Sequence, residues 1–133
     1  MKFRVQDSGR KFKMIALELD NGDVPAIEYL RNLKGRDEHA HKRLHNVMDL
    51  HKDEGPILNT RISRALTGDR YKGLYEFKTP QGARLFYFYL PGGLTVLTNG
   101  CDKTDPPEPC YERARDYKLQ VELEIANGAL QTG

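Results

Sequence analysis

The sequence predicts an α+β fold with a twisted antiparallel sheet of about four strands, two N-terminal helices packed on one face of the sheet and a C-terminal helix after the last strand. Three observations support this prediction. Apolar residues recur at helical spacing between residues 24 and 52, strand-like patterns replace them between residues 74 and 98, and helical spacing returns after residue 110. We expect residues 1–133 to form one domain, because the length suits a single core.

A strand and a short helix are expected first. The apolar run at residues 12–19 ends in a turn signal at residues 20–23, as a strand does before it turns. Pro25 suits the first turn of a helix over about residues 24–34. Gly35 interrupts the helical pattern, so we expect this helix to end there.

A second helix over residues 36–52 follows from apolar positions at i, i+4, i+7 and i+8, and Gly55 is expected to end it. The region also carries four histidines, of which His41 and His45 lie one helical turn apart. Two histidines at this spacing can share a metal ion, but no third type of ligand stands at a defined distance from them. A solvated helix face is the simpler interpretation, and we assign no metal and no cofactor.

Three strands of an antiparallel meander are expected next. Residues 74–78 alternate between polar and apolar side chains, residues 83–90 are nearly all apolar or aromatic, and a Pro-Gly-Gly turn leads into residues 94–98. After a proline-rich loop, residues 110–121 return to helical spacing. The segment 119–125 also alternates with period two, so the end of the chain stays open between helix and edge strand.

The two cysteines, Cys101 and Cys110, flank the proline-rich loop. Residues 1–7 lack the apolar stretch of a secretory signal, and no apolar run approaches the roughly 18–20 residues that span a bilayer. We therefore expect a cytoplasmic protein with no membrane association. In that compartment the two cysteines are better interpreted as reduced thiols than as a disulfide.

The net charge of +2 hides an uneven distribution. Residues 1–13 and 59–103 each carry +4, whereas residues 14–58 and 104–133 each carry −3. Such an asymmetry suggests a surface that binds a polyanion, although short segments also become patchy by chance. The sequence has no glycine-rich phosphate loop, no pair of CxxC motifs and no serine nucleophile elbow, so the common signatures of nucleotide, zinc and hydrolase sites are absent.

Three cations converge in the predicted meander. Lys78 ends one strand, Arg84 begins the next, and Lys103 follows the third. Fixed cations can stabilise the charge that builds on phosphorus when the 2′-hydroxyl of RNA attacks it, and a guanidinium is the best clamp for phosphate. Lys78 and Lys103 are then candidates for proton transfer or charge stabilisation. Tyr117 could supply a hydroxyl or stack on a base, with ordinary core packing as the alternative.

The second half of the chain contains three motifs in a fixed order before a proline and a helix. They are Leu74-Tyr75-Glu76-Phe77-Lys78, Ala83-Arg84-Leu85-Phe86-Tyr87-Phe88 and Gly100-Cys101-Asp102-Lys103. Over residues 66–117 this set resembles the RelE/HigB toxin family, including its phage-derived host-killing branch. That family has an L-x-E-L-R type strand, an R-x-x-Y/F type strand and a G-F-x-K-K segment. The resemblance implies a RelE/ParE-like fold.

The resemblance also implies a function. It describes the toxin of a type II toxin–antitoxin system, a metal-independent endoribonuclease (an mRNA interferase) that cleaves mRNA, commonly on the ribosome, and that a cognate antitoxin neutralises. Lys78, Arg84 and Lys103 match the family's basic positions. Cys101 replaces the family's aromatic residue and Thr104 replaces its second lysine, so the site has one cation fewer. Non-specific phosphate contacts upstream of the sheet are expected from Arg61, Arg64, Arg70 and Lys72.

Two alternatives to a nuclease remain open at this point. The related ParE toxins have the same fold and poison DNA gyrase by binding it, without chemistry of their own. A relic toxin that has lost activity and only binds its partner would also keep this sequence pattern.

Overall fold

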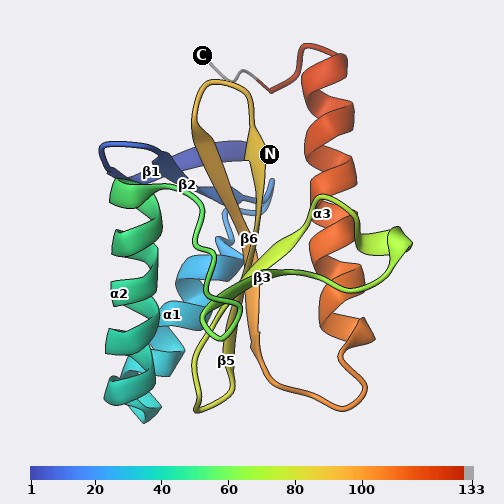
Figure 1. Cartoon of the computed structure of the whole chain (residues 1–133). Coiled ribbons are helices and arrows are strands. Elements are labelled where there is room, and N and C mark those ends of the chain that lie inside the picture. Colours follow the sequence, from blue (N-terminus) through green and yellow to red (C-terminus); the bar gives the residue numbers. More distant parts are fainter. Residues whose placement is uncertain (131–133) are drawn as a thin grey trace.

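The computed structural model describes residues 1–130, in which six strands and three helices form (Figure 1). The strands are β1 (Lys2–Ser8), β2 (Lys13–Glu18), β3 (Ser63–Ala65), β4 (Tyr75–Lys78), β5 (Ala83–Leu90) and β6 (Leu94–Asp102). The helices are α1 (Pro25–Arg36), α2 (Glu38–Glu54) and α3 (Glu108–Ala126), with a short 3-10 turn at Asp69–Tyr71. The strands join one sheet in the order β1-β2-β6-β5-β4-β3.

Helices cover both faces of this sheet, α1 and α2 on one face and α3 on the other (Figure 1). The alternation of β5 supplies both cores, because Leu85 and Tyr87 pack with α1 and α2 whereas Phe86 and Phe88 pack under α3. The predicted α+β class and the placement of the two N-terminal helices on one face are confirmed.

The predicted strand count and the purely antiparallel sheet were wrong. The described residues form six strands, and β2 pairs with β6 in parallel, so the sheet is mixed. The sequence prediction missed β1, an edge strand whose side chains are almost all exposed, and β3, which has three residues. Neither strand buries enough apolar surface to produce a recognisable alternation. The antiparallel meander β4-β5-β6 is as predicted.

Helix α1 was expected to end at Gly35, but it continues through this residue to Arg36. The break between the helices lies at Asp37, whose backbone N–H donates to Leu33 O (2.8 Å) and whose side chain accepts from the backbone N–H of Ala40 (3.1 Å). An N-capping carboxylate, and not the glycine, therefore separates α1 from α2. At the other end of the chain, α3 extends to Ala126, so the helical alternative for residues 119–125 is correct.

Contrary to what we expected, not all of the histidines of α2 lie on a solvated face of the helix. His51 is fully buried, stacks on Phe12 with ring centroids 4.7 Å apart, and lies with Nε2 2.9 Å from Thr95 Oγ1. Burial lowers the pKa of His51 to about 4, so the ring is neutral at physiological pH. His51 is thus part of the core, a role that the spacing of the histidines did not indicate.

Candidate functional site

Strand register places charged side chains next to one another on the face covered by α3. Arg64 pairs with Glu76 between β3 and β4, and Lys78 pairs with Arg84 between β4 and β5. Directly opposite residues of an antiparallel pair point to the same face, and so do Glu76 and Lys78, two residues apart on one strand. The result is a block of three cations around one carboxylate.

Lys103 reaches the same region from the other end of the meander. Its backbone N–H donates to Gly82 O (2.6 Å) in the turn between β4 and β5, which folds the segment after β6 against that turn. Gly82 has a φ of +98°, a conformation that favours glycine. The structure therefore brings together Lys78, Arg84 and Lys103, as strand pairing predicted.

A buried carboxylate organises the two arginines. Only 1% of the Glu76 side chain is exposed; its Oε1 lies 2.8 Å from Arg64 Nε and 3.8 Å from Arg84 Nε. Arg84 is further held by its Nη1, which donates to the carbonyl oxygens of Thr79 (3.1 Å) and Ala83 (3.0 Å). A buried carboxylate is tolerated only when it is paired, so Glu76 and the guanidiniums fix each other's positions. Arg64, 38% exposed against 13% for Arg84, presents more of its guanidinium to solvent.

The cations also act on Lys78. Its pKa is lowered from the ordinary value, first by burial and then by the positive charges of Arg64, Arg84 and Lys103, which outweigh the opposing effect of Glu76. A lysine in this position loses its proton more easily than one in water. This is the property expected of a lysine that exchanges protons during a reaction.

A pocket of about 250 Å³ opens in front of this cluster. Arg64, Glu76, Arg84 and Lys103 line it, and Tyr111 from the first turn of α3 lines it opposite the strands. Burial and the neighbouring Glu76 raise the pKa of Tyr111, so its hydroxyl keeps its proton at neutral pH. We call this pocket, with Lys78 beside it, the cation pocket.

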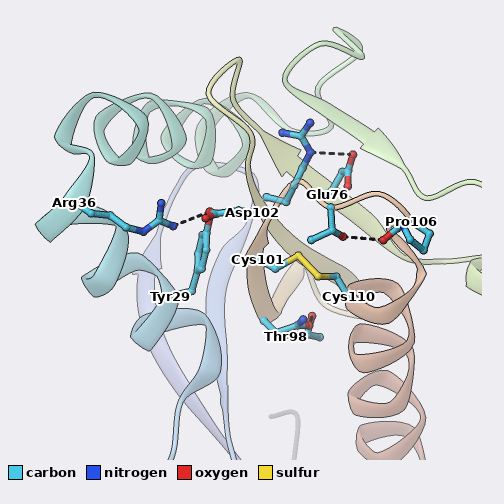
Figure 2. Close-up of a disulfide and its surroundings, with 11 residues drawn as sticks. Tyr29, Arg36, Glu76, Thr98, Cys101, Asp102, Pro106 and Cys110 are labelled. Atoms are coloured by element: carbon cyan, nitrogen blue, oxygen red, sulfur yellow. Dashed lines mark hydrogen bonds and ion pairs between the residues drawn. A yellow bond between two sulfur atoms is a disulfide. The ribbon is translucent and has the colours of Figure 1, made fainter.

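The segment between β6 and α3 closes one side of the cation pocket, and the structure corrects the prediction of two reduced thiols there. Cys101 and Cys110 are joined by a disulfide, and both line the pocket (Figure 2). The chain reverses between them, which brings their Cα atoms to 6.6 Å, within the range that a disulfide spans. The expected compartment alone favoured reduced thiols, and the distance between the two cysteines cannot be obtained from the sequence.

The end of β6 is also anchored to α1. Tyr29 Oη donates to Asp102 Oδ1 (2.8 Å), and Arg36 Nη2 donates to the same oxygen (2.6 Å), as Figure 2 shows. The ring of Tyr29 lies so close to Gly100 that a Cβ at that position would stand 2.2 Å from Tyr29 Cδ2. Burial raises the pKa of Asp102, but the bonds from Arg36 and Tyr29 outweigh it and lower the pKa overall.

Several predicted site residues lie elsewhere. Tyr117 lines a separate groove with Asn99 and Gly100, where α3 passes β6. Arg70 pairs with Glu112, its Nη2 3.1 Å from Oε2. The remaining two upstream cations are exposed and do not line the cation pocket; they are Arg61 and Lys72.

Sequence reasoning missed Glu76 and Tyr111, and it placed Arg64 among the peripheral contacts. Glu76 shares the period-two face of Lys78, which is the signal that could have found it. Tyr111 follows from the start of α3 at Glu108, because the first turn of that helix lies against the last two residues of β6, Cys101 and Asp102. Tyr117 stands six residues further along, so it points to another side of the helix.

Within residues 1–130, no group of three or more His, Cys, Asp or Glu side chains is arranged to hold a metal ion. Nor does any helix in that range have the length and apolarity to cross a membrane.

Residues 31–116 match the family model for phage-derived protein Gp49-like (DUF891). The chain belongs to this family. The Gp49-like family is a toxin family of type II toxin–antitoxin systems, of the RelE-like and HigB-like kind, so membership implies an antitoxin as partner. The matched region contains every residue of the cation pocket, whereas Tyr117 lies just outside it. No curated protein matches the chain.

Proposed function

We propose that this Gp49-like toxin is an endoribonuclease that cleaves mRNA in the cation pocket without a metal ion. The observation that supports the proposal is the arrangement of Arg64, Arg84 and Lys103 around one pocket, with Lys78 beside them and a buried Glu76 holding the arginines. A pocket of this size admits a single phosphodiester with parts of its two neighbouring riboses. The positive charge is concentrated where the phosphate would lie.

The reaction consistent with these groups is attack of a 2′-hydroxyl on the adjacent phosphorus, which forms a 2′,3′-cyclic phosphate and expels the 5′-oxygen of the next nucleotide. Negative charge grows on the non-bridging oxygens in the transition state, and preorganised cations stabilise it. The Nη groups of Arg64 are free of Glu76, whose contact is with Nε, so they can fork onto these oxygens. Tyr111 can donate a further hydrogen bond, since its hydroxyl stays protonated.

Two proton transfers complete the reaction. Lys78, with its lowered pKa, accepts the proton of the 2′-hydroxyl when it is in its neutral form. Lys103, exposed at the rim, donates a proton to the departing 5′-oxygen. Each bond change is thereby matched by a group of this chain, and no metal is required in the scheme.

We further propose that the substrate is mRNA on the ribosome and that the antitoxin covers the cation pocket. Arg61 and Lys72, exposed outside the pocket, are suited to contact ribosomal phosphates without specificity. A pocket that binds a polyanion is most simply blocked by an acidic segment, and such a complex should weaken as salt rises.

The experiment is to incubate the purified toxin with translating ribosomes and to map the ends of the mRNA. New ends carrying a 2′,3′-cyclic phosphate, unchanged in EDTA, are the expected result. Lys78→Met should remove them, and Lys42→Met, an exposed lysine on α2 outside the pocket, should not. Toxicity with no new ends, accompanied by inhibition of gyrase, would instead support the non-enzymatic alternative.

A further inference from the structure

The Cys101–Cys110 disulfide stands in the wall of the cation pocket. Cys101 lies opposite Arg84 in the register of β5 and β6, and Cys110 is the third residue of α3 (Figure 2). Both cysteines are half-buried and line the same pocket as Lys103. A reagent small enough to enter the pocket therefore meets the sulfur atoms without unfolding the protein.

Reduction would give the two sulfurs different properties, because their surroundings differ. Cys110 lies in the first turn of a 19-residue helix whose N-terminus has no side-chain cap, and Arg64, Arg84 and Lys103 line the pocket that it faces. The positive end of the helix dipole and the nearby cations both favour a thiolate over a thiol, against the carboxylates of Glu76, Asp102 and Asp105 in the same pocket. Cys101 belongs to the end of a strand, whose own backbone has little net dipole.

We propose that Cys101–Cys110 is a redox-active site, opened in the folded protein by a dithiol reductant, and that the Cys110 thiolate so formed lowers the affinity of the cation pocket for phosphate. The oxidised pocket has uncharged sulfur in its wall. The reduced pocket has one negative charge there, which competes with the substrate for the same cations. For the part that concerns RNA, this inference rests on the proposed function.

A dithiol reduces the disulfide in two exchange steps. A thiolate of the reductant attacks Cys101 Sγ, the S–S bond breaks, and Cys110 leaves as the more stable thiolate. The second thiol of the reductant then attacks the sulfur that joined Cys101, so that the reductant becomes a disulfide and Cys101 takes up a proton. Two electrons pass from the dithiol to the protein disulfide; of the two thiol protons, one goes to Cys101 and one to solvent.

The fold should survive this step because other bonds hold the segment between the cysteines. Lys103 N–H donates to Gly82 O, Asp102 is bound to Tyr29 and Arg36, and Thr104 Oγ1 donates to Pro106 O (2.9 Å). Reduction is therefore expected to change the charge of the pocket more than its shape.

The first test needs no nuclease activity. The folded protein is treated with dithiothreitol and then iodoacetamide, and we expect both cysteines to be alkylated without denaturant. In Cys101→Ser, the pH dependence of alkylation should give Cys110 a pKa of about 7.5 or lower, against about 8.5 for an ordinary thiol. Reduction only in denaturant, or a pKa of about 8.5 or above, would overturn the proposal.

The second test measures binding of a 2′-O-methyl RNA oligonucleotide, which cannot be cleaved by 2′-hydroxyl attack. We expect about tenfold weaker binding to the reduced protein at low salt, as one added charge near several phosphate contacts implies. The double variant Cys101→Ser, Cys110→Ser should bind equally with and without reductant. Equal binding by the oxidised and reduced wild-type protein would contradict the proposed redox site. Redox-dependent binding of this oligonucleotide, with no cleavage of unmodified mRNA on ribosomes in either state, would contradict the proposed nuclease instead.

Discussion

Strand β4 presents Phe77 to helices α1 and α2 and Glu76 to helix α3. Both side chains are buried, but the two faces of the sheet on which they lie differ in charge. On the α1 and α2 face, the buried titratable groups include His51 and Tyr87, both kept neutral by burial among aromatic rings, which lowers the pKa of the first and raises that of the second. On the α3 face, Glu76 is buried as half of an ion pair with Arg64. One sheet thus separates a neutral core from a charged one, and the candidate site is found only on the charged side.

The largest expected effect concerns the charged face. Arg84→Ala should slow RNA cleavage by roughly 10²–10³, or about 3–4 kcal/mol, because a preorganised stabiliser of the transition state is lost. Arg64→Ala should slow the reaction as well, since its guanidinium shares Glu76 and is the more exposed in the pocket. Single-turnover kinetics on a short RNA measure both.

The matched control is Arg61→Ala, outside the pocket, which should change binding and its salt dependence while the rate at saturation stays the same. Circular dichroism must show that each variant is folded, because the stem of Arg84 also packs. Folded Arg84→Ala that cleaves at the wild-type rate would place the chemistry elsewhere.

Removing the charge of Glu76 tests the buried ion pair itself. Glu76→Gln leaves two guanidiniums without their carboxylate in a buried setting, which should cost about 3 kcal/mol of unfolding free energy. Urea denaturation measures this loss. Glu122→Gln removes one half of the exposed Lys118–Glu122 pair and should cost less than about 0.5 kcal/mol. Similar losses for the two variants would show that the charged face is not buried in solution.

The neutral face, which α1 and α2 cover, should make the unfolding free energy depend on pH. The pKa of His51 is about 4 in the folded protein and 6.5 when unfolded, so the unfolded state binds the proton more readily. The contribution of His51 to stability is complete above pH 6.5 and is lost as the pH falls towards 4, by about 2–3 kcal/mol. Urea titrations across this window measure it. His51→Phe should flatten the acid slope, and His39→Gln on the exposed surface should leave it unchanged.

The smallest effects compare two glycines, Gly100 in β6 and Gly35 in the last turn of α1. Gly100→Ala pushes a methyl group into the Tyr29 ring and should cost about 1–3 kcal/mol while loosening Tyr29 from Asp102. Gly35→Ala meets nothing within 4 Å in the helix and should stabilise by about 0.5–1 kcal/mol. Differential scanning calorimetry would show shifts of opposite sign; a stabilising Gly100→Ala would contradict the packing described.

The sequence predicted those features that depend on periodicity and pairing. Apolar spacing located α1, α2 and the meander, and the order of the strands brought Lys78, Arg84 and Lys103 together. It missed β3 because three residues carry no period, and with β3 it missed that Arg64 belongs to the pocket. The site roles of these residues remain predictions.

Features that depend on distance in three dimensions could not be predicted in this way. A glutamate in an alternating strand suggests exposure, and only the approach of Arg64 and Arg84 explains why Glu76 is buried. The pairing of Cys101 with Cys110 depends on how tightly the loop turns. The choice between Tyr111 and Tyr117 depends on which turn of α3 meets the sheet.

The parallel pairing of β2 with β6 has a consequence for the order in which the protein is made. The last strand to be synthesised occupies a central place in the sheet, and the first two strands have no neighbour beyond each other until it arrives. Contacts so distant along the chain make folding slow. A nascent chain that ends before β6 therefore has neither a complete sheet nor a cation pocket, so the proposed nuclease site cannot form until synthesis has passed β6.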